Sequence, residues 1–173
     1  MISTIAAYPG GKHTLAPLLV RFMPNLSRNI SGFGGMANEI LAMPQRKIRI
    51  YNDKDKDLCI LLSCFAKEET RVKLFHEILK YEYCKENFME LKAKTSSGYY
   101  GQVEIWVYAA WVWYTLLVSR DGGREAYSKD KDMEMGKNFQ HRIMGKKWDL
   151  MRLEGIGVWN KDIYDLIEEE IQN

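Results

Sequence analysis

The amino-acid sequence predicts an α/β protein built on a parallel sheet, and two segments carry this prediction. Residues 29–53 have the pattern strand, glycine turn, helix, strand. Residues 155–171 have the pattern of a further strand and helix. Because a strand-helix-strand unit pairs its strands in parallel, both segments favour a parallel sheet.

The first segment divides into three expected elements. Residues 29–33 predict a strand that stops at the glycines, and residues 38–43 predict a helix closed by Pro44. Residues 47–51 (KIRIY) alternate charged with β-branched or aromatic side chains, which is typical of a short strand ending near Asn52.

The middle of the chain predicts helices. We expect Asp57 to cap a helix that runs to Phe65, and an amphipathic helix to follow from 68 to about 94. The remaining expectations are a loop at 95–101, an aromatic helix at 103–118, an irregular stretch at 119–145, a strand at 155–159, and a helix that Asp162 starts, with Ile163, Leu166, Ile167 and Ile171 on its apolar face.

Composition limits the function classes. The 173 residues are 46% apolar and carry a formal net charge of +2, so any nucleic-acid contact has to come from a local patch. Three cysteines and the lack of a basic-then-apolar leader predict a reduced, cytoplasmic protein. The cysteine and histidine spacings predict no metal site, and the apolar run at 105–118 is shorter than the ~20 residues that a bilayer requires, so we expect a buried helix.

The string YPGGKHT at 8–14 contains a Gly-Gly-Lys triplet. A nucleotide-binding phosphate loop requires glycine and Ser or Thr at two further positions, and here those positions hold Ala6 and His13. The triphosphatase interpretation therefore fails. On its own the string predicts a surface turn with a solvated Lys12.

The string SGFGGMA at 31–37 lies where the first strand meets its helix. Glycines at such a junction let a ligand approach the backbone. Asp53 follows Gly35 by eighteen residues and ends the next strand, a placement that suits an acid accepting hydrogen bonds from the ribose hydroxyls of an adenosyl ligand. The alternative is a tight turn followed by a helix-capping aspartate.

The order YPGGK, FGG, YNDKDKDL and, after a helical segment, NKDI resembles the Dam-type adenine-specific DNA methyltransferases common in bacteria and their phages. The resemblance covers about residues 5–65 and 150–173. It implies a Rossmann-like S-adenosylmethionine-dependent methyltransferase sheet with a mostly helical inserted subdomain. It also implies a first part of the core at 1–65, a helical insertion with a candidate target-recognition region at 66–150, and a return at 151–173 to a core that is incomplete at its C-terminus.

The resemblance also implies which residues bind S-adenosylmethionine. They are Tyr8 and Lys12 beside the cofactor, the turn Phe33, Gly34 and Gly35, the ribose-binding Asp53, Asp162 near the adenine ring, and Ile163 packing against that ring. The chain departs from the family where the glycine motif usually has an acid, a proline and a closing glycine. Those places hold Ser31, Gly32 and Ala37.

The family's catalytic motif DPPY is absent, because the prolines of this chain are Pro9, Pro17, Pro24 and Pro44. In that family the motif orients the adenine amino group and stacks on the flipped base. We therefore expect the front part of an adenine methyltransferase, truncated or split, that methylates nothing by itself. The alternative is a non-catalytic DNA-binding or regulatory protein derived from such an enzyme.

The expected partner is double-stranded DNA. Lys137, Arg142, Lys146, Lys147 and Arg152 place five positive charges within sixteen residues, and the resemblance adds Arg120 and Arg124 after the aromatic helix. We take Arg142, Lys146, Lys147, Arg120 and Arg124 as candidate DNA contacts, with a solvated helix face as the alternative.

A second expected partner follows from the sheet. In methyltransferase sheets the strand that carries DPPY lies beside the first strand, so residues 29–33 should have one unpaired side. Open strand edges recruit other strands. We expect a homodimer, or a second chain that completes the sheet.

Overall fold

The structure is a computed structural model that describes residues 5–24, 26–45, 48–120, 123–128 and 138–172. Its elements in chain order are α1 (Ala16–Phe22), β1 (Arg28–Ser31), α2 (Asn38–Ala42), β2 (Ile48–Asn52), α3 (Lys56–Phe65), α4 (Glu68–Ile78), α5 (Lys85–Ser96), α6 (Ile105–Val118), α8 (Phe139–Gly145), α9 (Lys147–Met151), β3 (Gly157–Trp159) and α10 (Ile163–Gln172).

The three strands form one parallel sheet in the order β1-β2-β3. Ile30 pairs with Ile50, and Ile50 pairs in turn with Gly157 on β3. The predicted parallel α/β arrangement is therefore confirmed, with strand positions close to those expected. Because the strands are parallel, their carboxyl ends meet at one edge of the sheet.

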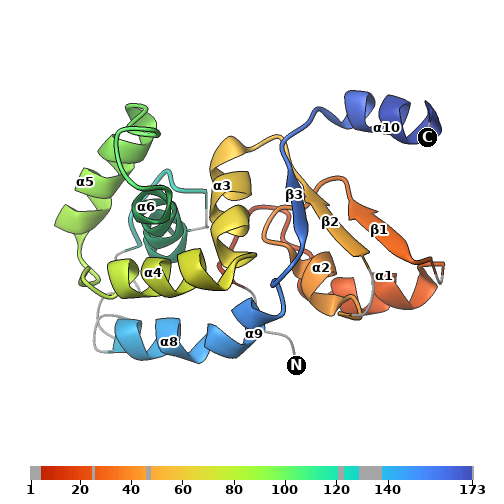
Figure 1. Cartoon of the computed structure of the whole chain (residues 1–173). Helices are drawn as coiled ribbons and strands as arrows, with labels where there is room; N and C mark the ends of the chain where they lie inside the picture. The colour runs from red at the N-terminus through yellow and green to blue at the C-terminus, as the bar shows by residue number, and fades with distance from the viewer. Residues whose placement is uncertain (1–4, 25, 46–47, 121–122, 129–137, 173) are drawn as a thin grey trace.

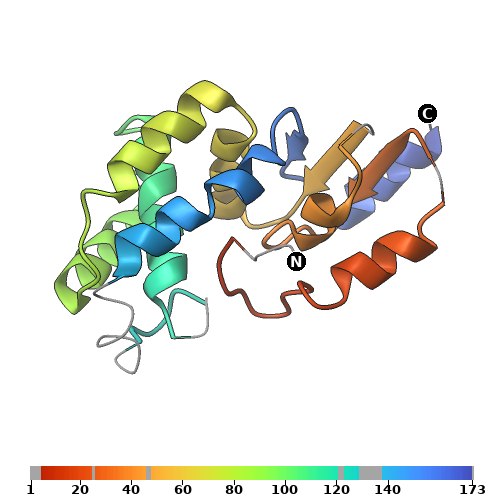
Figure 2. The same ribbon diagram turned by 90° about the horizontal axis from the view of Figure 1, so that it is seen from below.

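The helices divide between the sheet and a helical region. Figure 1 shows the strands together with α1 and α2 on one side of α3, and α4, α5, α6 and α8 on the other. Seen from below in Figure 2, α8 and α9 run beside α4, while α10 lies at the far end near the strands. Helix α3 joins the two parts, because it packs on α4 and α6 and also contacts β3.

Helix α6 is buried, as the sequence predicted for the aromatic segment, and it packs against α3, α4 and α5 in the hydrophobic core. Its Trp113 is fully buried and meets the rings of Phe65 and Phe75 edge to face, at centroid distances of 5.0 and 5.5 Å. Such aromatic pairs add stability beyond the area that they bury. One continuous cluster of buried residues runs from the sheet helices into the helical region.

The prediction of a single helix from 68 to about 94 is wrong. Two helices, α4 and α5, occupy the segment, and residues 79–84 turn between them. The backbone N–H groups of Lys80 and Tyr81 donate to Glu77 and Ile78, which closes α4 with short turns. Cys84 then starts α5, because its sulfur accepts a hydrogen bond from the N–H of Asn87. The apolar spacing continues across the turn, so periodicity alone misses this break.

Three smaller expectations also need correction. The cap of α3 is Asp55 rather than Asp57, since the Asp55 carboxylate accepts from the N–H groups of Asp57 and Leu58. Helix α5 extends to Ser96, into the expected loop. Residues 138–145 include α8 instead of irregular chain, whereas 129–137 lie outside the described residues.

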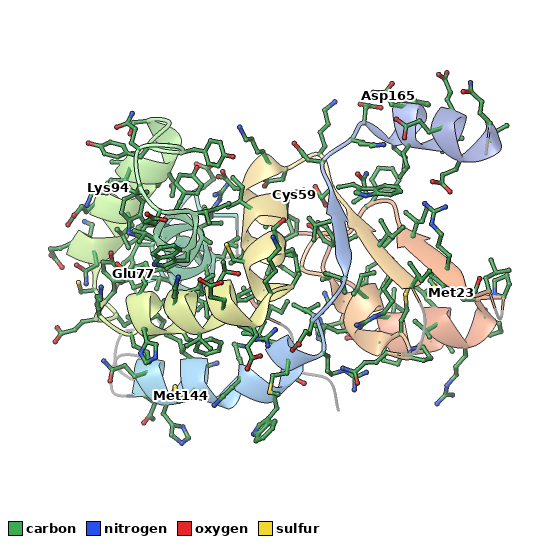
Figure 3. The ribbon with its side chains drawn as sticks, in the orientation of Figure 1. Met23, Cys59, Glu77, Lys94, Met144 and Asp165 are labelled. Atoms are coloured by element: carbon green, nitrogen blue, oxygen red, sulfur yellow. The ribbon has the colours of Figure 1, made fainter. Side chains whose placement is uncertain are left out.

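Within the described ranges, no helix is both long and apolar enough to cross a membrane. The three cysteines are free thiols. Figure 3 shows Cys59 on α3, and its Sγ lies 3.2 Å from the carbonyl oxygen of Trp159 on β3.

Candidate functional site

A cavity of about 190 Å³ lies at the carboxyl ends of β1 and β2. The N-terminal turn forms one wall and the glycine turn after β1 forms another. This cavity brings together six of the residues predicted from the sequence to bind a cofactor, namely Tyr8, Lys12, Phe33, Gly34, Gly35 and Asp53. Its other lining residues are Pro9, Gly10, Gly11, Met36, Asn38 and Glu39.

The glycine turn packs directly on β2. The N–H of Gly34 donates to the carbonyl of Asn52 at 2.8 Å, and a Cβ at Gly34 would lie 2.1 Å from the Tyr51 ring. Tyr51 is fully buried, and its hydroxyl donates to the carbonyl of Gly35 at 2.8 Å. Only glycine at position 34 allows this close approach.

Two residues of the turn adopt left-handed backbone conformations. Gly35 has φ +47° and Ala37 has φ +55°. Ala37, at the position where the resemblance would place a glycine, therefore has a backbone conformation that favours glycine although the residue has a Cβ.

Asp53 joins the glycine turn to the start of α3. Its Oδ2 accepts the N–H of Gly35 at 2.8 Å, and its Oδ1 accepts the N–H of Asp55 at 2.9 Å. A carboxylate has about four lone-pair sites, so each oxygen can accept one more hydrogen bond. Because Asp53 lines the cavity, two neighbouring hydroxyls of a ligand could use those sites.

Glu39, on the first turn of α2, is a cavity residue that sequence reasoning missed. Its Oε2 accepts the Ser31 hydroxyl at 2.7 Å, and its Oε1 lies 3.1 Å from the Nζ of Lys12. The carboxylate of Glu39, from α2, therefore lies directly against Ser31 at the end of β1. No sequence pattern links Glu39 to Ser31, because the contact depends on how α2 turns back.

Asn52 is the second residue that sequence reasoning missed. Its buried side chain donates from Nδ2 to the carbonyls of Gly32 and Lys161, and its Oδ1 accepts the N–H of Lys161. One amide therefore joins the ends of all three strands. Its place directly before Asp53, at the end of a strand, is the only signal that the sequence offered.

Two aromatic residues line the cavity, of which Tyr8 is half-buried and Phe33 is exposed. Burial raises the pKa of Tyr8, and the charges of Asp55 and Asp53 raise it further, so its phenol stays protonated at neutral pH. Phe33 is 69% exposed although it lines the cavity, which leaves its ring accessible to a ligand.

Asp162 and Ile163 are not among the residues that line this cavity. Asp162 accepts the N–H of Tyr164 at the start of α10 and pairs with Lys54 at 3.1 Å; both contacts lower its pKa. The side chain of Ile163 lies against Gly32, where an added Cβ would come within 2.7 Å of its Cδ1. Asp162 and Ile163 therefore lie beside the glycine turn but outside the cavity lining.

The candidate DNA contacts lie on separate elements. Arg124 is held by Asp57 at 2.6 Å and by Asp55 at 3.8 Å, so its guanidinium fastens the segment after α6 to α3. Arg120 is exposed, and its backbone N–H donates to the carbonyl of Ala126. The described contacts give Arg124 a structural role and leave the side chain of Arg120 exposed.

Arg142, Lys146 and Lys147 lie on and between α8 and α9. Arg142 and Lys147 are exposed, and Lys147 lines a groove of about 380 Å³ with Trp148, which is 74% exposed. Burial lowers the pKa of Lys146, and the nearby charge of Arg142 lowers it further. Lys137 lies outside the described residues, and Arg152 donates to the carbonyl of Leu41.

In the described part of the chain, no group of three or more His, Cys, Asp or Glu side chains could hold a metal ion. No protein-family model matches the chain, and no curated protein matches it either.

Proposed function

We propose that the chain is the S-adenosylmethionine-binding part of an adenine-specific DNA methyltransferase with a Rossmann-like sheet. The observation that carries the proposal is the position of Asp53, directly after β2, in a cavity that the glycine turn and the N-terminal turn also line. In open parallel sheets, ligands bind outside the carboxyl ends of the strands.

The cavity residues fit the chemistry of that cofactor. The spare lone pairs of Asp53 suit the two ribose hydroxyls, and the exposed ring of Phe33 offers an apolar surface. Gly34 and Gly35 permit close approach to the backbone. The bound cofactor would supply the methyl group, while these residues would bind and orient it.

Methyl transfer needs groups beyond those of the cavity. The 173 residues contain no DPPY motif, so nothing in them matches the family's means of orienting the adenine amino group. We expect this chain by itself to transfer no methyl group to duplex DNA. The altered glycine motif, with Ser31, Gly32 and Ala37 in place of an acid, a proline and a closing glycine, favours a second candidate function, a non-catalytic DNA-binding or regulatory protein derived from such an enzyme.

Calorimetric titration with S-adenosylmethionine separates the two candidates. The proposal predicts binding by the wild-type chain and a loss of about 1 to 3 kcal/mol in Asp53→Ala, through the charge-assisted hydrogen bonds that are removed. Asp165→Ala is the matched control, because Asp165 is exposed on α10 and does not line the cavity (Figure 3). Absence of binding would favour the regulatory function.

A further inference from the structure

We infer that Lys12 and Glu39 form a subsite for the amino-acid end of the ligand, in which Glu39 binds the α-ammonium group and Lys12 binds the α-carboxylate. This inference rests on the proposed function. It adds a ligand contact for Glu39, a residue that neither the sequence patterns nor the resemblance assigned.

The first argument is charge. Lys12 Nζ and Glu39 Oε1 lie 3.1 Å apart, and both residues line the same cavity as Asp53. S-adenosylmethionine has an adenosine end that carries hydroxyls and an amino-acid end that carries one positive and one negative charge. Adjacent side chains of opposite sign complement that end, while Asp53 complements the ribose.

The second argument is position. The Ser31 hydroxyl holds Glu39 Oε2 at 2.7 Å, so Oε1 remains directed toward Lys12 and the cavity. The Glu39 side chain is 15% exposed and stands on a helix, whereas that of Lys12 is 40% exposed at the end of a flexible stem. A ligand would therefore meet a fixed carboxylate and an ammonium group that can move.

The third argument is the small cost of opening the ion pair. Because the Lys12 side chain is 40% exposed, its ammonium group is partly solvated, and the pair contributes less to folding stability than a fully buried pair would. When a zwitterion enters, each residue exchanges one charged partner for another. The exchange keeps every charge paired.

Two ligands test the inference. S-adenosylhomocysteine carries the amino-acid end, and 5′-methylthioadenosine has the same adenosine and the same neutral thioether sulfur without it. Calorimetry on the wild-type chain and on Glu39→Gln measures both affinities. The amide of this variant would keep an oxygen that accepts the Ser31 hydrogen bond, so thermal melting of the variant should match that of the wild type.

We expect Glu39→Gln to weaken S-adenosylhomocysteine binding by about 10- to 100-fold, as for a lost charge-assisted hydrogen bond, and methylthioadenosine binding by less than about twofold. Lys12→Met should show the same selectivity. Glu168→Gln, at an exposed position on α10, is the control and should change neither affinity.

These measurements distinguish a failure of the inference about Glu39 from a failure of the proposed function. If both ligands bind the wild type and Glu39→Gln weakens both equally or neither, Glu39 only shapes the cavity, and the inference is overturned while the proposed function stands. If neither ligand binds the wild type, the proposed function is overturned and the inference with it.

Discussion

The backbone N–H of Gly35 donates to Asp53 Oδ2 at 2.8 Å, which fastens the glycine turn after β1 to the end of β2. Asn52 fastens the end of β3 to the same place. The cavity is therefore built on a cross-linked edge of the sheet. Because its geometry depends on a few identified contacts, single substitutions test it.

Gly34→Ala should lower the free energy of unfolding by about 1 to 3 kcal/mol, the usual cost of overpacking. The added Cβ would overlap the buried Tyr51 ring, whose hydroxyl is anchored to Gly35. Urea denaturation measures the loss. Gly145→Ala is the control, because a Cβ there meets nothing within 4 Å and the residue ends helix α8. Equal stability of the two variants would contradict the packing described for the turn.

Asn52→Ala should lower the free energy of unfolding by about 2 kcal/mol or more, because it leaves backbone groups at the ends of β1 and β3 without their partner. Thermal denaturation followed by circular dichroism reports the change. Asn29→Ala, which removes one exposed hydrogen bond of 3.5 Å, should have little effect. A variant at position 52 as stable as the one at position 29 would show that the strand ends need no such link.

Local patterns predicted the sheet and the part of the cavity that Asp53 and the glycine turn form, whereas Tyr8 and Lys12 were expected there only from the resemblance. The alternation in 47–51 and the glycines after residue 31 are short-range signals, and both correspond to what the structure contains. Strand-helix-strand order then implies parallel pairing, so the meeting of Asp53 with the glycine turn follows from the order of the elements along the chain.

Other features depend on tertiary contacts that no local pattern encodes. Glu39 contacts Ser31 only because α2 folds back over the end of β1. Arg124 pairs with Asp57, which lies 67 residues earlier in the chain. The break between α4 and α5 was missed because the apolar spacing persists through Tyr81 and Tyr83, whose rings pack in the core. Long-range packing decides such positions.

If the basic residues of α8 and α9 contact DNA phosphates, the DNA-binding constant should fall as the salt concentration rises. We expect the double variant Arg142→Ala, Lys147→Ala to bind duplex DNA more weakly and to reduce the slope of log K against log salt by about 2, one for each phosphate contact. Fluorescence anisotropy across a salt series measures this slope. Lys85→Ala, an exposed lysine on α5, is the control. An unchanged slope in the double variant would place the DNA contacts elsewhere.

Self-association is expected from the sheet. Among the described residues, no strand pairs with the outer side of β1, and a groove of about 510 Å³ that Glu170 helps to line runs beside it. Tyr164 and Ile171 on α10 are more than 70% exposed. We expect a homodimer, or completion by a second chain. A compact monomer with a sharp melt in sedimentation at micromolar concentration would contradict this expectation.

The most direct test of the central claim is a crystal structure of the chain grown with S-adenosylhomocysteine, the cofactor without its transferable methyl group. The account predicts the ribose hydroxyls within hydrogen-bond distance of Asp53 and the amino group of the ligand at Glu39. Density for the ligand outside this cavity, or a cavity left empty at saturating ligand, would contradict it.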